Sequence, residues 1–464
     1  MYDTIIIGAG MSGLAAGIRL AYFGQRVCIL ERHYTIGGLN SFYRLNGRDY
    51  DVGLHAVTNF TPKGTRTGPL ARLLRQLRIR WDELLLAPQV GSVVAFPGIE
   101  LHFSNEFEKL ESEINNKFPS QGDNFRRLLK RIVDYNDLDQ AVYEMSARQV
   151  VEEIIDDPLL VEMIFCPLMW YGNAREHDMD FGQFCIMFRS IYMEGLARPL
   201  NGVRLILKHL VRKFRGLGGE LVLRTGVEQI EVEKGRAIGV VLDDGNQLTA
   251  RHVLSSAGIV ETMRMCNGSR CEENHSVGQL SFVETLAVLD QQPRQIGCDR
   301  TIVFFNDSEK FHWEKSTELC DVRTGVICSP NNYAYGELGD QDAKLPEGMM
   351  RVTALANFQR WNTLPESEYR VEKLRWFDRV IASAVRFVPD FRRYIVDTDM
   401  FTPKTIRRFT WHDNGAVYGA PEKQWNGITP FENLYICGTD QGFVGIVGAI
   451  VSGISMANQH CLRD

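Results

Sequence analysis

The chain has 464 residues, of which 44% are apolar, and its formal net charge is −6 at pH 7. This length exceeds one ordinary domain, and the apolar content can supply a substantial core. Because both signs of charge are spread along the chain, nothing suggests nucleic acid as a partner.

The ten cysteines are scattered, and the closest pair, Cys266 and Cys271, lacks both CxxC spacing and a matching pair of histidines. We therefore expect reduced, mostly buried thiols and no metal site, which fits the cytoplasm. The first predicted strand begins at residue 2, so we expect no cleavable signal peptide. No window reaches the length of an apolar transmembrane helix, so we expect a protein that is soluble or sits on a membrane surface.

A strand, a glycine-rich turn and a helix open the chain. Residues 4–7 are apolar and rich in β-branched side chains, as in a parallel strand that is buried on both faces. Residues 8–13 read GAGMSG, and apolar residues then follow at helical spacing. Gly8 permits the tight turn, Gly10 lets a pyrophosphate approach the backbone, and Gly13 lets the helix pack closely on the strand. The phosphates would bind at the helix N-terminus.

An acid and a second glycine pair follow this unit. Residues 26–30 form another apolar run that ends in Glu31, close to the spacing at which an acid binds ribose hydroxyls. Residues 37–41 read GGLNS, and residues 50–55 read YDVGLH. These motifs resemble the FAD-dependent superfamily of amine oxidases, phytoene desaturases, carotenoid isomerases and retinol saturases. GGLNS departs from the Gly-Gly-Arg of many members, as the isomerase and saturase branch also does, and YDVGLH is similar to the Phe-Asp-x-Gly-x-His segment of that branch.

The next part of the chain is expected to leave the nucleotide-binding fold. Residues 90–96 and 99–103 are predicted strands around a Pro-Gly turn. Ser104 is expected to cap a helix that runs through residue 118. Two more helices are predicted over residues 123–145 and 147–155.

Residues 158–196 are apolar, sulfur-rich and aromatic. Side chains of this kind fill an irregular core or line a channel for a flexible apolar ligand. Core packing explains any single residue at least as well. For the segment as a whole we favour the channel, since a flavin enzyme needs an apolar site over its ring. An exposed apolar rim near residues 158–193 would also dock on a membrane surface.

The chain is then expected to return to the nucleotide domain. A helix over residues 201–215 ends at a glycine pair, and strands are predicted over residues 220–223, 227–232 and 237–242. This stretch resembles the mid-chain return of the superfamily. The resemblance implies that Val227 contacts the adenine and that residues 255–258, which include Ala257, form a small-residue turn at the cofactor.

Residues 276–394 alternate strands, such as 282–289, 322–328 and 350–356, with one long helix over roughly residues 366–387. We expect these elements to form the floor and the lid of a substrate domain.

The C-terminal part closes the nucleotide site. Residues 434–438 form a short strand that ends at glycine, and residues 443–453 read as a helix. The resemblance implies that Asp440 bonds the ribityl chain or the pyrophosphate. The helix N-terminus near Gly445 would face the flavin, where its partial positive charge stabilises the anionic reduced ring. Close helix packing is an alternative explanation for the glycines of this helix, and the two explanations are compatible.

No Ser-His-Asp order, catalytic carboxylate pair or metal-ligand spacing stands out, which agrees with chemistry that relies chiefly on the flavin. His55 is the best polar candidate for a catalytic residue, with a merely structural histidine as the alternative. Two interpretations are open for the charged residues that precede the C-terminal motif. They approach the flavin from the other side, or they form surface ion pairs. These residues are Arg407, Arg408 and His412. The resemblance implies FAD contacts from Gly8, Gly10, Met11, Ser12, Gly13, Glu31, Arg32, Gly38, Leu39, Asn40, His55, Val227, Ala257, Gly438, Asp440, Gly445, Ile446 and Val447.

We therefore predict an α/β protein in which a discontinuous Rossmann-like FAD-binding domain carries an inserted α+β substrate domain. Residues 1–100, 197–275 and 395–464 are assigned to the FAD-binding domain, and residues 101–196 and 276–394 to the substrate-binding domain.

The predicted function is FAD-dependent desaturation or cis–trans isomerisation of double bonds in a long apolar chain, such as a carotenoid, a terpenoid or a related lipid. The protein is expected in the cytoplasm or peripherally on a membrane. A retinol-saturase-like reductase, a flavin amine oxidase and a flavin-bound carrier without turnover are the alternatives. Only one strand–glycine turn–helix–acid unit is present, so NADH and NADPH are not expected to be direct reductants.

Overall fold

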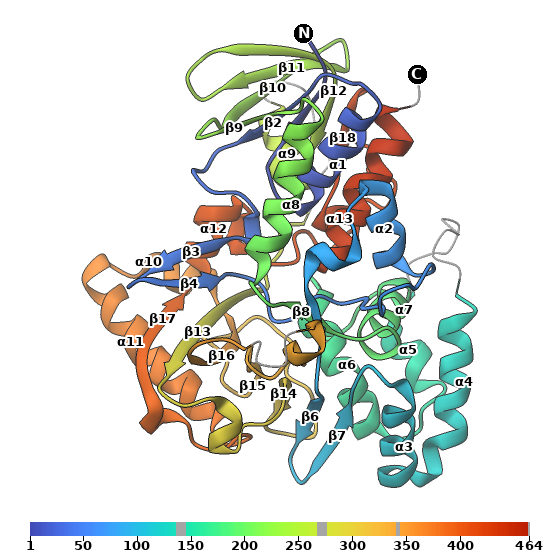
Figure 1. The fold of residues 1–464 in the computed structure, drawn as a ribbon, viewed down its shortest axis with the longest axis vertical. Helices are drawn as coiled ribbons and strands as arrows, with labels where there is room; N and C mark the ends of the chain where they lie inside the picture. Colours follow the sequence, from blue (N-terminus) through green and yellow to red (C-terminus); the bar gives the residue numbers. More distant parts are fainter. Residues whose placement is uncertain (136–144, 267–275, 340–343, 463–464) are drawn as a thin grey trace.

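The computed structural model describes residues 1–135, 145–266, 276–339 and 344–462, and two seven-stranded sheets organise them (Figure 1). The nine cysteines in these ranges are buried, as the sequence analysis expected for most of them. Among the described residues, no helix is both long and apolar enough to cross a bilayer.

The first sheet, at the top of Figure 1, carries the N-terminal motif. Its central strand β1 pairs in parallel with β12 and β2, because the intervening chain crosses over through helices. An antiparallel hairpin, β10–β11, extends one edge. In spatial order the strands are β10 (Val227–Glu233), β11 (Arg236–Leu242), β12 (Gln247–Ser255), β1 (Tyr2–Ile7), β2 (Val27–Glu31) and β9 (Glu220–Leu223), while β18 (Leu434–Ile436) pairs with β12. This is the Rossmann-like arrangement that the sequence predicted.

Helices cover this sheet at close range because glycines remove side chains at the contacts. A Cβ on Gly17 would lie 2.7 Å from Ile29 Cδ1, and one on Gly453 would lie 2.0 Å from the carbonyl oxygen of Ser12. The packing alternative for Gly453 is therefore confirmed. The helices concerned are α1 (Met11–Tyr22), α2 (Pro69–Leu77), α8 (Val203–Gly216) and α13 (Gly445–Met456).

The second sheet is antiparallel except where β14 pairs in parallel with β6. In spatial order its strands are β17 (Ile395–Phe401), β13 (Ser281–Leu289), β16 (Gly348–Ala356), β15 (Thr324–Cys328), β14 (Ile302–Asn306), β6 (Ser92–Phe96) and β7 (Ile99–Phe103). Helix α11 (Glu366–Ala384) packs on one face, and a helical bundle packs on the other. The bundle contains α3 (Phe107–Lys117), α4 (Gly122–Val133), α5 (Ala147–Glu152), α6 (Pro158–Gly172) and α7 (Phe181–Phe188), which continues as a π-helical turn over Arg189–Met193.

The apolar segment over residues 158–196 differs from its expectation. Most of its side chains between residues 160 and 192 are buried in the core that the bundle shares with β6 and β7. Only Trp170 and Tyr171 reach the cavity described below. The segment is chiefly a packed core, and the exposed apolar rim expected near residues 158–193 is wrong, because the second sheet covers it.

Short elements connect the two sheets. They are the hairpin β3 (Phe42–Leu45) and β4 (Arg48–Asp51), the pair β5 (Leu86–Pro88) and β8 (Ala197–Pro199), and the helices α9 (Ile259–Met265), α10 (Phe358–Thr363) and α12 (Pro403–Thr410).

Several expected boundaries move. Helix α3 begins at Phe107, because the Ser104 hydroxyl accepts the N–H of Glu106 in a turn before the helix. Helix α4 ends at Val133, and residues 136–144 of the longer expected helix lie outside the described residues. Strands β6 and β17 pair in the second sheet, although residues 1–100 and 395–464 were assigned to the FAD-binding domain. Hydrophobic pattern identifies a strand but not the sheet in which it pairs.

Candidate active site

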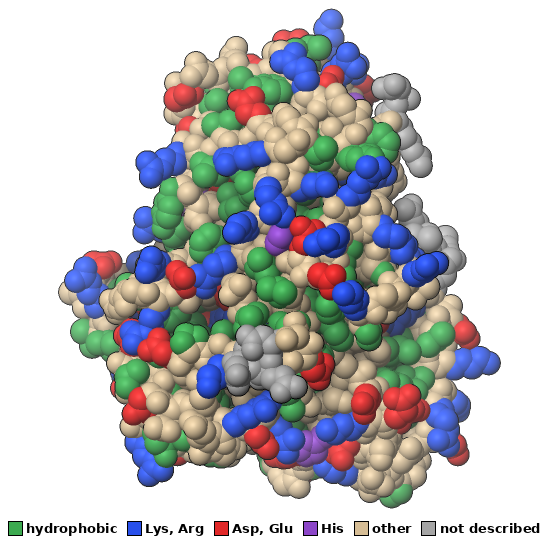
Figure 2. All heavy atoms as spheres, viewed as in Figure 1, with side chains coloured by type: hydrophobic (Ala, Val, Ile, Leu, Met, Phe, Trp, Pro, Cys, Tyr) green, Lys and Arg blue, Asp and Glu red, His purple; other side chains and the backbone are tan. Residues whose placement is uncertain are grey.

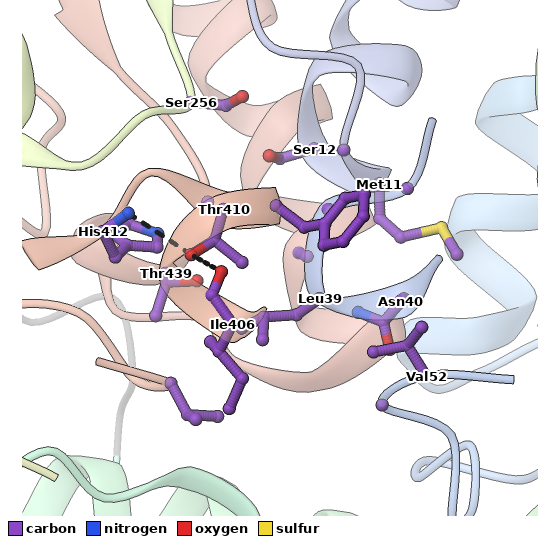
Figure 3. A pocket seen from close by; sticks show the side chains of 18 of the residues that line it. Met11, Ser12, Leu39, Asn40, Val52, Ser256, Ile406, Thr410, His412 and Thr439 are labelled. Carbon is purple, nitrogen blue, oxygen red and sulfur yellow. Dashed lines mark hydrogen bonds between the residues drawn. The ribbon is translucent and has the colours of Figure 1, made fainter. Parts of the chain in front are cut away.

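One cavity extends from the first sheet to the second, and most of the predicted cofactor residues line it. Figure 3 shows Met11, Asn40 and Val52 on one side and His412 and Thr439 on the other. The predicted residues in the lining are Gly8, Gly10, Met11, Ser12, Glu31, Arg32, Gly38, Leu39, Asn40, His55, Val227, Ala257, Gly438, Gly445 and Ile446. The lining does not include Gly13, Asp440 and Val447.

The three glycines of the first turn have the geometry that their spacing predicted. Gly8 has a φ of +96°, which favours glycine, and a Cβ there would lie 2.5 Å from Ser256 Oγ. A Cβ on Gly13 would lie 2.1 Å from the carbonyl oxygen of Gly8, so Gly13 serves the packing of α1 on β1. A Cβ on Gly10 would meet no atom within 4 Å, because Gly10 faces the cavity.

Glu31, the last residue of β2, places a fixed carboxylate at the end of the cavity that the glycine turn lines. Glu31 accepts hydrogen bonds from the backbone N–H groups of Ala9 at 2.8 Å and His33 at 3.0 Å. Beside it, Arg32 donates to the carbonyl oxygen of Val227 at 2.8 Å, and its guanidinium lies 4.0 Å from the ring centroid of Trp411. These contacts bring the two halves of the nucleotide motif, far apart in sequence, to one place.

Asp440 lies behind the cavity wall. Its carboxylate accepts the backbone N–H groups of Ile259 and Ala420, at 2.7 and 2.8 Å. Lys423 Nζ lies 3.9 Å away, and burial lowers the pKa of that amine to about 8. Asp440 therefore joins α9 to the C-terminal motif, and its direct contact with a ribityl chain or pyrophosphate stays a prediction.

The start of α13 opens onto the cavity. Gly445 has a φ of +74°, and the atom nearest to a Cβ there would be Thr58 Oγ1, at 3.8 Å. The first N–H groups of a helix have no partner within the helix, so this end offers donors and a partial positive charge. Val447 is buried against the helices of the first sheet instead.

His412 also lines the cavity, as one of the three C-terminal candidates. Its ring Nδ1 lies 3.7 Å from Glu261 Oε2. Burial opposes the charged form, but the Glu261 carboxylate outweighs it and raises the pKa of His412. Arg407 and Arg408 are exposed and do not line the cavity, and Arg407 lies 3.9 Å from Asp413, which fits the surface ion-pair alternative.

The other end of the cavity is aromatic. Phe282 and Tyr418 meet edge to face with centroids 5.8 Å apart, and Trp170 lies 5.2 Å from Phe282. The buried Trp170 Nε1 and Tyr171 hydroxyl make no hydrogen bond in the described part of the chain. Burial also raises the pKa of Tyr171, which keeps the phenol neutral. This end suits an apolar ligand, and it offers two hydrogen-bond donors that have no partner among the described residues.

Sequence reasoning missed the polar partners of His55, which come from the second sheet. His55 Nε2 lies 3.0 Å from Glu284 Oε1 and 3.0 Å from Thr353 Oγ1. Arg351 in turn donates to Glu284 at 2.6 Å. Nothing in the local sequence around Glu284 or Thr353 marks them, because their role depends on strand pairing. Asp51, from the same motif as His55, instead pairs with the buried Arg198 and accepts the N–H of Val203 at the start of α8.

Comparisons with known proteins agree with this geometry. The chain matches the family described as flavin containing amine oxidoreductase over residues 11–459. Prolycopene isomerase 2, chloroplastic, from an Oncidium hybrid cultivar is 22% identical over 99% of this chain and 83% of its own. The lycopene-forming phytoene desaturase of Pseudescherichia vulneris is 26% identical over 99% of both chains. The crystal structure of an oxidoreductase from Methanosarcina mazei has the same fold, with a TM-score of 0.68 and 17% identity over 98% of this chain and 99% of that one.

The residues present fit FAD. Gly10 and Gly38 leave open space beside their backbone, as a pyrophosphate requires, since a Cβ on either would meet nothing within 4 Å. Glu31 presents an anchored acceptor to a sugar, and the N-terminus of α13 offers donors. FAD is the cofactor that the family match supports, and the residues of this cavity would suit it.

Proposed function

Because the chain belongs to the flavin-containing amine oxidoreductase family, we propose that it is an FAD-dependent enzyme that desaturates or isomerises double bonds in a long polyene. One observation carries the proposal: the cofactor residues and an aromatic, apolar wall line the same cavity. The substrate class also agrees with the names of the relatives, which act on lycopene-type polyenes. Between the two reactions we favour isomerisation, because the YDVGLH motif resembles the isomerase and saturase branch.

The chain's own residues bind and orient the substrate. When bound, FAD accepts and returns hydride equivalents. Phe282, Trp170 and Tyr418 form a wall against which a flat polyene packs, and this wall excludes water from the reacting bonds. The indole N–H of Trp170 and the hydroxyl of Tyr171 donate hydrogen bonds to the π electrons of the substrate or to an ordered water.

The amine oxidase alternative is disfavoured by the charge of the aromatic end. A protonated amine that is buried needs a negative charge beside it to compensate its own. The buried carboxylate of Glu284 is already compensated by Arg351 and bonded to His55. No uncompensated negative charge is therefore left for a substrate cation at this point.

Product analysis tests the proposal. FAD-loaded enzyme is incubated with a cis-polyene, a partly saturated polyene and, in parallel, a primary amine, and the products are separated by chromatography. We expect a changed double-bond geometry or number in the polyene and no aldehyde from the amine. Conversion of the amine alone would contradict the proposal, and net reduction of the polyene would favour the reductase alternative.

We also propose that the enzyme collects its substrate at an anionic membrane surface. Residues 52–81 and 195–219 contain no Asp or Glu. Figure 2 shows Lys and Arg side chains, with some Asp and Glu side chains among them, across the face that carries α2 and α8. Lys213 Nζ joins the two segments by donating to the carbonyl oxygen of Arg78 at 3.4 Å, and Arg212 pairs with Glu83 at 3.0 Å. The exposed cations on this face are Arg66, Arg72, Arg75, Arg78, Arg80, Lys208, Arg212 and Arg215. Such a face attracts anionic headgroups, at about 1 kcal/mol per cation near the surface.

Vesicle flotation tests this surface. The wild type should float with anionic vesicles but not with zwitterionic vesicles, and added salt should release it. The variant Arg75→Gln/Arg80→Gln should bind less than the wild type. The control variant Arg370→Gln/Arg375→Gln removes two exposed charges from α11 and should bind normally. Equal binding by both variants would contradict this surface.

A further inference from the structure

His55 lies where the cavity passes from the nucleotide motif to the second sheet. Its Nε2 is 3.0 and 3.1 Å from the two carboxylate oxygens of Glu284. Glu284 on β13 and Thr353 on β16 are directly paired across the two strands, and both line the cavity. The ring is thus held against a polar pair that the sheet itself fixes.

Glu284 is an ionised carboxylate. Burial opposes its charge, but Arg351, followed by His55, outweighs burial and lowers the pKa of Glu284 to about 2. An ionised carboxylate can only accept hydrogen bonds, and Thr353 donates its hydroxyl hydrogen to Glu284. The nitrogen of His55 that faces this carboxylate must therefore carry a hydrogen.

The backbone of His55 is fixed as well. Arg351 donates to the carbonyl oxygens of Val52 and Leu54, and the Tyr333 hydroxyl donates to that of His55 at 2.8 Å. A turn of the imidazole would break the contacts of Nε2 with Glu284 and Thr353. In the described part of the chain, all hydrogen bonds of the ring are made by Nε2 and none by Nδ1, and the side chain is 13% exposed where it lines the cavity.

We propose that His55 exchanges a proton with the substrate through Nδ1, and that Glu284, Thr353 and Arg351 are positioning residues that keep the hydrogen of the neutral ring on Nε2. This inference rests on the proposed function and names the proton carrier of that reaction. Neither the family match nor the sequence motifs assign a role to the residues of the second sheet.

The proposed step balances. Desaturation breaks two C–H bonds and forms one C=C π bond. One hydrogen leaves as a hydride equivalent to the acceptor that bound FAD would provide, and the other leaves as a proton that the Nδ1 lone pair accepts. The imidazolium that results lies beside the Glu284 carboxylate, which stabilises its charge. In isomerisation or reduction, Nδ1 of the neutral ring first takes up a proton from water, and the imidazolium then transfers that proton to the polyene.

The tautomer can be read without any substrate. In FAD-loaded protein with ¹⁵N-labelled histidine, the His55 signals are those missing from His55→Gln. At a pH high enough for the ring to be uncharged, we expect the hydrogen on Nε2, and a shift of the tautomer balance toward Nδ1–H in Glu284→Gln. Thr353→Val, which leaves the ion pair in place, should cause a smaller shift. Thr398→Val makes the same change at an exposed position of the same sheet and should cause none. A wild-type ring with hydrogen on Nδ1 would overturn the inference.

Chemical rescue tests the proton transfer itself. His55→Ala, assayed with saturating FAD, should convert the polyene about 10²–10⁴ times more slowly than the wild type. Added imidazole should restore part of the rate. A His55→Ala enzyme within threefold of the wild-type rate, or one that imidazole does not rescue, would contradict proton exchange at this residue. If the wild type has the expected tautomer but does not convert the polyene, the proposed function is wrong. The polyene is then also wrong as the partner that exchanges a proton with His55.

Discussion

Two glycine-to-alanine substitutions in one turn should have opposite effects on the apoprotein. In Gly13→Ala the new methyl would lie 2.1 Å from a backbone oxygen, which cannot rotate away as a side chain could. Helix α1 must shift by an ångström or more, and overpacking of this kind costs about 1–3 kcal/mol. Gly10→Ala introduces no contact within 4 Å, and Gly10 has extended backbone with a φ of −71° that alanine tolerates. Its apoprotein should be unchanged, or more stable by about 0.4–1 kcal/mol.

For FAD binding, Gly10→Ala should be the more damaging of the two substitutions. The methyl of Gly10→Ala enters the cavity where the pyrophosphate is expected, so FAD binding should weaken at least tenfold, which is about 1.4 kcal/mol. Urea unfolding of the apoproteins and FAD titration by flavin fluorescence measure the two effects separately. If Gly10→Ala binds FAD like the wild type, the cofactor does not lie along this turn. If apo Gly13→Ala is as stable as the wild type, the close packing of α1 on β1 is wrong.

Three further predictions follow from buried charges and from the single nucleotide motif. Arg198→Met leaves Asp51 buried without its ion-pair partner, so the free energy of unfolding should fall by about 3–5 kcal/mol, whereas Arg198→Met with Asp51→Leu should lose less. Glu284 has its pKa lowered from 4.5 to about 2, so it stabilises the fold above pH 4.5 and loses this contribution as the pH falls toward 2, and acid unfolding of Glu284→Gln should lack that component. NADPH mixed anaerobically with the oxidised enzyme should not bleach the flavin in a stoichiometric step, and rapid bleaching would restore the reductase alternative.

The nucleotide site could be predicted from the sequence because its geometry is local. Gly8, Gly10 and Gly13 each have a role fixed by the turn between one strand and the next helix, and the structure gives each the expected surroundings. Glu31 follows for the same reason, since it ends the strand that pairs with β1. The spacing of a few residues is therefore enough to predict such a site from the sequence.

The chemical end of the cavity could not be predicted in the same way. His55 is separated from Glu284 by 229 residues and from Thr353 by 298. The pairing of β13 with β16 places Glu284 beside Thr353, and the tertiary fold brings His55 to both. The apolar segment from residue 158 was ambiguous for another reason, because core and channel side chains are chemically alike. Burial against β6 and β7 decides between them, and burial is a property of the tertiary fold.

Anaerobic single turnover on a polyunsaturated lipid, followed by flavin absorbance and product analysis together, tests the central claim most directly. With reduced enzyme, the account predicts a rearranged double bond and no net oxidation of the flavin, as isomerisation requires. Bleaching of the oxidised enzyme by the polyene would identify desaturation, the other reaction proposed here. An unchanged polyene and an unchanged flavin with both forms of the enzyme would contradict the account.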